Sequence, residues 1–487
     1  MKKADPAVED LKEKALAAIA RRRGDIIRFA EDVYRTPELG FKEERTAART
    51  AAFLADLGLE VRTGLALTGV KAVADGQAPW SGSRRTGPKK ERGEEPPGET
   101  AAPPRVAVLG ELDAVVCPGH PAADPVTGAA HACGHHAQLA VMAGAAVGLT
   151  EPDVLRGLSG SVVFMAVPAE EYVELEYRFR LREEGKVEFL GGKPELIRLG
   201  EFDDVDMAIL VHSGSRPGPK MSPGGTSNGF VGKFVRYIGR EAHAGASPWA
   251  GVNALNAALV ALSAVNALRE TFSEEDSVRV HPIVTKGGDL VNIIPADVRL
   301  ETYVRARTIQ AVTETSRKVD RAFKAGALAL GTTVEIRDAP GFLPMLPDPE
   351  LSRIYRRNLE RLVGAENVSD GGHMAGSTDM GDLSHVMPAL HPYGAGVEGR
   401  PHCADYRVVD PDLAYIRPAE AVALTVIDLL ADGAREADRV RRAARPPMTR
   451  AEYIEFARSL FRRTVYPEPE AAGAAGSGNP KEDDDRW

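Results

Sequence analysis

Apolar residues at helical spacing open the chain. Leu11, Ala15 and Ile19 recur at intervals close to 3.6 residues, and Ile26, Phe29 and Val33 continue the pattern. This periodicity predicts an amphipathic helix over residues 7–35. A second helix is expected near Glu43–Leu57, where Gly58 ends it.

Short apolar runs then alternate with a helical segment. Val106–Leu109, Ser161–Val167 and Met207–Val211 are typical of buried strands, and the Ala-rich, apolar stretch His135–Leu149 is typical of a core helix. This alternation predicts an α/β domain with a mixed, largely parallel sheet. In such a sheet the active site lies outside the carboxyl ends of the strands.

From about Thr226 the pattern changes to longer strands and two further helices. The expected strands are 230–239, 278–286, 298–307 and 332–338, and the expected helices are 252–271 and 310–330. Their β-α-β-β-α-β order predicts a small two-layer domain at residues 225–338, inserted between the catalytic parts 1–224 and 339–466. Thr449-Arg-Ala-Glu452 is a capping box that opens a last helix.

Two segments lack a pattern that could build a core. Residues 75–105 hold six prolines among Gly, Ser and charged residues, and we expect a disordered or extended insertion there. The tail 467–487 is small or charged and is also expected to be disordered.

Composition narrows the class of protein. A chain of 487 residues with 43% hydrophobic and 27% charged residues is typical of a soluble globular protein of two domains. The net charge of −9 speaks against a nucleic-acid partner. Three cysteines cannot form a disulfide framework, which suits a reducing compartment. Residues 1–25 lack the apolar core of a signal peptide, and no run of eighteen apolar residues occurs, so we expect a cytoplasmic protein without a membrane partner.

The segment His131-Ala-Cys-Gly-His-His136 is the strongest chemical signal. Gly134 permits a turn that lets Cys133 and His135 point toward one place. A thiolate with an imidazole suits zinc and its transition-metal neighbours, although a buried thiol beside a hydrogen-bonded histidine is the alternative.

Other polar residues follow the apolar strands. Glu170 and Glu171 follow 161–167, and His212 follows 207–211. Adjacent carboxylates leaving a strand point in different directions, so one can bind metal while the other acts as a general base. A solvated acidic turn is the alternative for this pair, but the apolar strand before it favours a functional role. Together these residues predict a metal-dependent hydrolase.

Several motifs in one order resemble the di-metal aminoacylase and carboxypeptidase family. They are Gly110-Glu-Leu-Asp113-Ala, His131-Ala-Cys-Gly-His135, Pro168-Ala-Glu-Glu171, His212, His243-Ala-Gly-Ala, Asn292-Ile-Ile-Pro295, Arg305, Gly376-Ser-Thr-Asp379 and His402. The chain is similar in particular to the amidohydrolase branch, which includes hippurate, indole-acetyl-amino-acid and aminobenzoyl-glutamate hydrolases. The resemblance implies a metallopeptidase-type catalytic domain with an inserted lid and dimerisation domain.

The resemblance also implies roles at the metal site. It assigns two divalent ions, zinc or alternatively manganese or cobalt, to five ligands: Cys133, His135, Glu171, His212 and His402. Glu170 would be the general base and acid. Asp113 would orient a ligand, although a helix or turn cap is its alternative role.

The remaining residues implied by the resemblance concern the substrate. His243 would reach the site of a neighbouring subunit in a homodimer formed through residues 225–338, although as a lone histidine it would be read as a surface residue. Asn292, Arg305, Ser377 and Thr378 would contact the substrate, with Arg305 on a carboxylate or, alternatively, in a salt bridge along its strand.

The implied substrate is a small N-acyl or N-aroyl amino acid, or a dipeptide, with a free carboxylate. A dipeptidase or carboxypeptidase of the same family is an alternative, as is a non-catalytic metal-binding relative, which the intact Glu170 disfavours.

The chain departs from the family pattern at two sites. His136 stands where many relatives have Asp, which could alter metal affinity. His402-Cys-Ala-Asp405 stands where the family often has His-Ser-Pro, so His402 is the least secure ligand, with His385 and His391 nearby in sequence.

Overall fold

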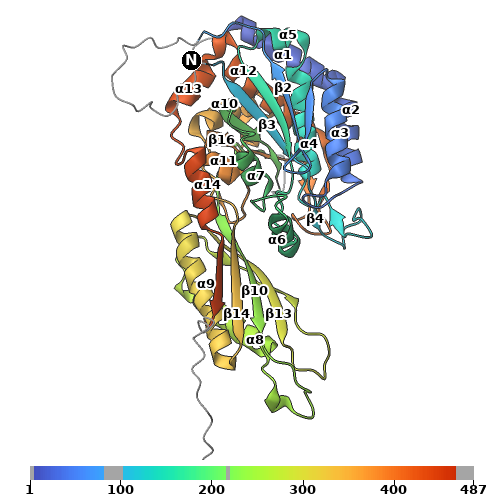
Figure 1. Cartoon of the computed structure of the whole chain (residues 1–487). Helices are drawn as coiled ribbons and strands as arrows, with labels where there is room; N and C mark the ends of the chain where they lie inside the picture. Colours follow the sequence, from blue (N-terminus) through green and yellow to red (C-terminus); the bar gives the residue numbers. More distant parts are fainter. Residues whose placement is uncertain (1–4, 82–101, 215–219, 468–487) are drawn as a thin grey trace, which may run out of the picture.

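The computed structural model describes residues 5–81, 102–214 and 220–467. They form a larger α/β domain and a smaller, elongated domain that projects from it (Figure 1). The two-domain arrangement and the mixed α/β class expected from the sequence are confirmed.

The larger domain is built on a six-stranded mixed sheet with the order β1-β2-β6-β3-β7-β16. The central strands β6, β3 and β7 and the edge strand β16 run parallel, while β1 and β2 are antiparallel to their neighbours. The strands span Val61–Leu65 (β1), Gly69–Asp75 (β2), Arg105–Glu111 (β3), Ser161–Val167 (β6), Met207–Leu210 (β7) and Ala389–Leu390 (β16).

Helices cover both faces of this sheet. In β3, Val106 and Val108 pack against one helical layer, and Ala107 and Leu109 pack against the other. The first layer contains α1 (Pro6–Arg21), α2 (Arg23–Tyr34), α3 (Glu44–Asp56), α4 (His135–Leu149), α5 (Pro152–Gly157), α10 (Pro349–Val363), α12 (Arg417–Leu430) and α13 (Arg435–Ala443). The second contains α7 (Gly192–Leu199), α11 (Met380–Ser384) and α14 (Arg450–Ser459). Within the described residues, no helix is long and apolar enough to cross a membrane.

The first helical segment differs from its prediction. Residues 7–35 form two helices rather than one, because the backbone at Arg22 leaves the helical region (φ −101°, ψ 15°). The two halves can therefore pack at different angles against α4. The predicted helix ended by Gly58 is present as α3, and Gly58 has the positive φ of 80° that favours glycine.

The smaller domain is an antiparallel sheet with the order β11-β13-β10-β14-β20, covered on one face by two helices. Its elements are β10 (Gly229–Ile238), α8 (Ala254–Ala267), β11 (Arg279–Val280), β12 (Ile283–Lys286), β13 (Asp297–Ala306), α9 (Ile309–Leu330) and β14 (Thr333–Pro340). The single strand predicted at 278–286 is split into β11 and β12 at His281-Pro282, where proline cannot donate a ladder hydrogen bond.

One strand crosses the predicted domain boundary. Residues 339–466 were assigned to the catalytic domain, but β20 (Arg462–Tyr466) pairs with β14 in the smaller sheet. Arg462 donates to Asp338 and Asp320, the two carboxylates that also hold the buried Lys233. β20 pairs with β14 because its Arg462 binds two buried carboxylates. The hydrophobic periodicity of the sequence cannot reveal such a contact.

The expected insertion at 75–105 is ordered at both ends. Gly76 N–H donates to Gly160 O (2.8 Å), and Trp80 Nε1 donates to Asp438 (3.1 Å). Of the two expectations, disordered or extended, disorder was wrong for 76–81, which Trp80 and backbone donors anchor, and for 104–105, where Ser161 N–H donates to Pro104 O (3.0 Å) and Arg105 begins β3. Residues 82–101 and the tail 468–487 lie outside the described residues.

Candidate metal centre

The predicted ligands gather where the parallel strands end. Glu111 is the last residue of β3, Glu170 and Glu171 follow β6, and His212 follows β7. α4 begins at His135 directly after Gly134, whose φ of 91° only glycine adopts readily. The chain turns sharply there, which presents Cys133 and His135 to the strand ends.

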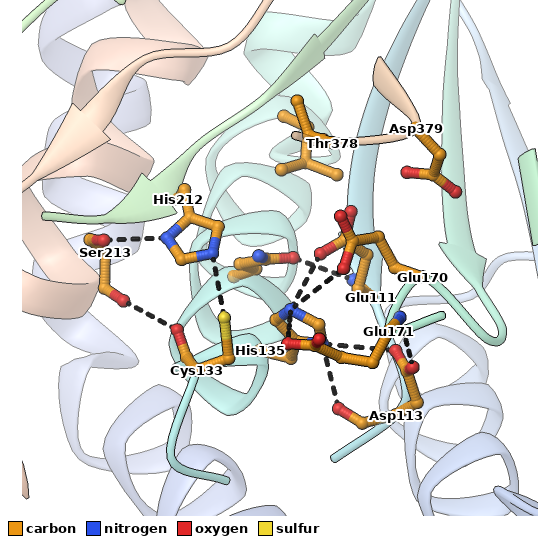
Figure 2. Close-up of polar contacts among 12 residues, drawn as sticks. Glu111, Asp113, Cys133, His135, Glu170, Glu171, His212, Ser213, Thr378 and Asp379 are labelled. Atoms are coloured by element: carbon orange, nitrogen blue, oxygen red, sulfur yellow. Dashed lines mark hydrogen bonds and ion pairs between the residues drawn. The ribbon is translucent and has the colours of Figure 1, made fainter. Parts of the chain in front are cut away.

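Two groups of ligand atoms share the Cys133 thiol, and Figure 2 shows Cys133 with His135 and His212 of the first. One group is Cys133, His135 and His212, and the other is Cys133, Glu171 and His402, each with its ligand atoms within 4.8 Å of one another. The Cys133 Sγ lies 3.5 Å from His212 Nε2, and His402 Nε2 lies 3.1 Å from Glu171 Oε1. The structure thus brings all five sequence-predicted ligands together.

The hydrogen bonds leave the ligand atoms free. His212 Nδ1 donates to Ser213 O (2.7 Å), and His135 Nδ1 donates to Asp113 O (2.9 Å), so each Nε2 keeps its lone pair. His135 Nε2 and Glu171 Oε1 are buried polar atoms without a hydrogen-bond partner among the described residues. Buried atoms of this kind are normally satisfied, so the donor set fits metal ions.

The electrostatics of the thiol agree with this fit. Burial opposes ionisation of Cys133, as does Glu171, but the facing His212 and His135 prevail and lower its pKa to about 6. Thiolate is the form that binds metals. Its sulfur would therefore be available to metal held by either ligand group.

Asp113 contacts two ligands at once. Its Oδ1 lies 3.1 Å from His135 Nδ1, and its Oδ2 accepts the backbone N–H of Glu171 at 2.8 Å. The carboxylate is fully buried. It therefore fixes the orientation of His135 and the place of Glu171, as expected for a residue that orients a ligand.

Glu170 is placed differently from its neighbour Glu171. Its Oε2 lies 3.8 Å from His135 Nε2, and no hydrogen bond to its carboxylate is formed within the described chain. Burial, Glu111 and Glu171 raise its pKa well above the ordinary value. A buried carboxyl group of raised pKa near these residues is suited to accept a proton and to return it, as a proton shuttle requires.

A buried charge cluster lies behind Glu170. Lys193, fully buried, donates to Glu111 Oε1 at 2.6 Å and to Asp379. Burial opposes ionisation of Glu111, but Lys193 and His135 prevail and lower its pKa to about 2. Sequence reasoning missed Glu111 and Lys193: Glu111 stood inside a quoted motif, whereas a lone lysine among glycines gave no signal.

Glu111 Oε2 lies 3.1 Å from His135 Nε2 and has no hydrogen-bond partner in the described parts of the chain. Glu111, His135 and Glu170 form a third group of ligand type beside the two that share Cys133.

The turn that carries Glu170 is clamped from two sides. Ala169 has a positive φ of 54°, its N–H donates to the buried Glu43 (2.8 Å), and its carbonyl accepts from Arg178 (3.1 Å). Arg178, on α6 (Leu175–Glu183), also donates to Glu171 O. A side chain at Gly40 would lie 2.6 Å from the Arg178 guanidinium, so this position has room only for glycine. The strained turn is held by its surroundings.

His385 and His391, the two histidines near His402 in sequence that could have been the ligand instead, have other hydrogen-bond partners. His385 is buried and donates to Gly381 O (2.9 Å), and His391 donates to Leu210 O (3.1 Å). Neither belongs to a ligand group. His136 is buried between the rings of Tyr34 (5.0 Å) and His131 (5.5 Å), it is in no ligand group of the described residues, and burial lowers its pKa to about 3.

A cavity of about 600 Å³ opens over these residues, within the size range of small-molecule sites. Four aromatic side chains from the two domains line one part of it: Tyr172, Phe230, Tyr303 and Phe342. Arg305 donates to Ser377 Oγ (2.7 Å), and Thr378 lies beside them in the wall. The structure thus brings Arg305, Ser377 and Thr378 to the cavity. The alternative of a salt bridge for Arg305 is not observed among the described residues.

Two predicted site residues do not line this cavity. His243 and Asn292 are exposed and lie together on the smaller domain, where Ala244 N–H donates to Asn292 O (2.8 Å). The backbone N–H groups of Gly245 and Ala246 donate to His243 Nδ1, which leaves Nε2–H as an outward donor. Within a single chain the two residues are separate from the ligands.

Comparison with known proteins gives a family and several relatives. The model of the peptidase family M20/M25/M40 matches residues 107–427. A Xaa-Arg dipeptidase of Mus musculus is 30% identical over 440 residues, which covers 87% of this chain and 90% of the relative. One component of the p-aminobenzoyl-glutamate hydrolase of Escherichia coli (strain K12) is 28% identical over 258 residues, which covers 51% of this chain and 48% of that component.

Solved structures share the fold. A Bacillus subtilis protein described as a dinuclear metal-binding peptidase of the M20 family has a TM-score of 0.58 at 18% identity, with 85% of this chain and 99% of that chain covered. At that identity the likeness establishes the fold alone.

Proposed function

This chain belongs to the peptidase family M20/M25/M40 and is a metal-dependent hydrolase, and we propose that it cleaves the amide bond of N-acyl or N-aroyl amino acids with a free carboxylate. Two divalent ions, zinc or alternatively manganese or cobalt, would be held by Cys133, His135, Glu171, His212 and His402. The single observation that carries the proposal is the buried Glu170 carboxylate, which has no hydrogen-bond partner among the described residues, beside two ligand groups that share one thiol.

When bound, the metal ions supply a water of lowered pKa and polarise the substrate carbonyl. Glu170 takes the proton of the attacking water and delivers it to the departing amine, for which its raised pKa suits it. Asp113 and the clamp of Glu43 and Arg178 keep the ligands and Glu170 in place during these transfers.

The substrate would lie between the two domains. Arg305, held by Ser377 and stacked on Phe230 (5.0 Å) and Tyr303 (5.2 Å), offers a planar fork to a carboxylate. The aromatic wall suits a flat or apolar acyl group. His243 and Asn292 of a second subunit would complete the site, with His243 Nε2–H as a donor to the tetrahedral oxygen.

A dipeptidase is the second candidate, because one relative that aligns with most of this chain is a Xaa-Arg dipeptidase. The two activities differ in what precedes the scissile amide: an acyl group without charge, or an amino acid with a free ammonium group. One panel separates them, with N-benzoyl and N-acetyl amino acids in one arm and the matching Ala-X dipeptides in the other.

The panel is run on protein whose metal content has been measured. We expect about two ions per chain and faster hydrolysis of the acyl series, both lost on chelation and restored by zinc, manganese or cobalt. Faster cleavage of dipeptides would assign the second candidate. Bound metal without cleavage of either series would contradict both.

A further inference from the structure

Two arginines stand side by side on the sheet face that lines the cavity. Arg279 of β11 is the cross-strand partner of Arg305 of β13, and Arg305 is in turn paired with Phe230 of β10. All three line the cavity, while the alternate residues Val280 and Val304 pack under the helices. The register of the sheet therefore places the row formed by Arg279, Arg305 and Phe230 at the cavity.

The two guanidinium groups have no carboxylate partner among the described residues. Arg279 donates to Val278 O (2.8 Å) and Arg305 donates to Ser377 Oγ, and neither takes part in an ion pair within those parts of the chain. Like charges directly opposite one another on a sheet destabilise it. Other arginines of this domain do have acidic partners, such as Arg236 and Arg299, which both bind Asp297.

The rest of the cavity strengthens this charge. Lys220 also lines it, from the other domain, and has no ion-pair partner among the described residues. The only carboxylates among the described lining residues are Glu170 and Glu171, which belong to the metal centre. Arg279, Arg305 and Lys220 therefore face the cavity, and no described lining carboxylate outside the metal centre balances their charge.

We propose that the unpaired row of Arg279 and Arg305, with Lys220, selects substrates whose amino-acid part carries two carboxylates, as in N-acyl glutamate or aspartate. Arg305 takes the α-carboxylate and Arg279 the side-chain carboxylate, with Lys220 adding attraction from the opposite wall. This inference rests on the proposed function. It also separates this chain from a Xaa-Arg specificity, because no free carboxylate of the described cavity could receive a basic side chain.

The test compares three substrates that share one acyl group: N-benzoyl-glutamate, N-benzoyl-glutamine and N-benzoyl-arginine. Glutamine has the shape of glutamate without its second charge. We expect kcat/KM for the glutamate compound to exceed that for the glutamine compound ~10- to 100-fold, the range of a charge-assisted hydrogen bond. Arg279→Gln should lower this ratio at least fivefold, and Arg279→Glu should reverse the preference toward the arginine compound.

Arg321→Gln is the matched control, because Arg321 is exposed on α9 and does not line the cavity. It removes the same charge from the same domain and should leave the ratio unchanged. Equal ratios in wild type and Arg279→Gln would overturn the inference, as would a wild-type preference for glutamine or arginine. Those results would leave the amidohydrolase proposal standing, whereas no hydrolysis of any of the three by metal-loaded protein would contradict that proposal itself.

Discussion

Glu170 and Glu171 are neighbours in sequence with opposite electrostatic surroundings. His402 outweighs the burial of Glu171 and keeps its pKa well below the ordinary value, whereas burial and nearby carboxylates raise that of Glu170. The difference arises because Glu171 lies against His402 (3.1 Å) whereas Glu170 lies in the group with Glu111. This difference supports the two roles proposed for them.

The first prediction separates these roles. Glu170→Gln should retain about two metal ions per chain but lose activity by ~10²- to 10⁴-fold, because a proton shuttle is removed and no ligand is lost. Glu171→Gln should lose metal and activity together. Elemental analysis and steady-state kinetics of both variants decide the matter, and similar metal contents in the two would contradict the assignment.

Glu43 gives a prediction on pH. Burial, together with the nearby Asp113, raises its pKa to about 7, above its value in an unfolded chain. The group therefore destabilises the fold increasingly as pH rises from about 4.5 to 7, with the full cost above 7 and none well below 4.5, on the order of 3 kcal/mol. Glutamine can accept from Ala169 N–H and donate to Thr68 Oγ without titrating.

Glu43→Gln should accordingly match wild type near pH 4.5 and melt at a higher temperature than wild type at pH 8. Thermal unfolding of both proteins, recorded at the two pH values with equal metal loading, checks this. A constant difference between the two proteins across that interval would show that Glu43 does not titrate with a raised pKa.

At the scale of elements, the connection from β2 to β3 shows how ordered ends can flank a polar insertion. Trp80 reaches Asp438 on α13, and Ser81 donates to Gly433 O (2.9 Å). These contacts fasten the outgoing chain to the helical layer. The proline-rich composition of 82–101 gives that part little apolar surface to bury.

Two deletions test this division. Replacing 82–101 by a short Gly/Ser linker should leave the melting temperature within about 2 °C of wild type, since a shorter flexible loop costs little closure entropy. Deleting 77–103, which removes Trp80, should lower it by about 5 °C or more. Equal melting temperatures for the two deletions would mean that the Trp80 anchor contributes nothing.

At the scale of the whole molecule, the proposed site would take His243 from a second chain. The ligands belong to the larger domain, and Arg279 and Arg305 reach them from the smaller one, but His243 remains exposed and apart from the cavity. Exposed apolar side chains are found on the same domain, such as Leu259, Ile283 and Val291. A second copy docked there would bury them and supply His243.

Mixing two inactive variants tests this arrangement. His243→Ala and Glu170→Gln should each be nearly inactive alone, while random reassembly gives about half heterodimers with one intact site each. About a quarter of wild-type activity should return, by the symmetry of a twofold dimer. Glu170→Gln mixed with Glu171→Gln is the control and should recover nothing. No recovery in the first mixture after verified subunit exchange would place His243 outside the neighbour's site.

Local patterns in the sequence were sufficient for the two domains, most elements and the five ligand candidates. Strands such as 161–167 are buried on both faces and read as unbroken apolar runs, and helix ends carry their own caps, as in the box of Thr449 and Glu452. Glu171 and His212 were recognisable as ligand candidates because they follow such strands, and parallel strands end on one edge; Cys133 and His135 stood out by their own motif, and His402 came only from the family resemblance. These features depend on neighbours in sequence, so the sequence alone determines them.

Tertiary structure decided what depends on distant partners. Lys193 gains its role from Glu111 and Asp379, β20 pairs where Asp338 and Asp320 bind Arg462, and Arg279 meets Arg305 only through the register of two strands. The sequence does not distinguish a lysine, an arginine or a short polar strand with a structural role from one that is only solvated. That role depends on the charged group that lies opposite in the fold. The physical reason is that electrostatic interactions act through space, while the patterns that predict helices and strands act along the backbone.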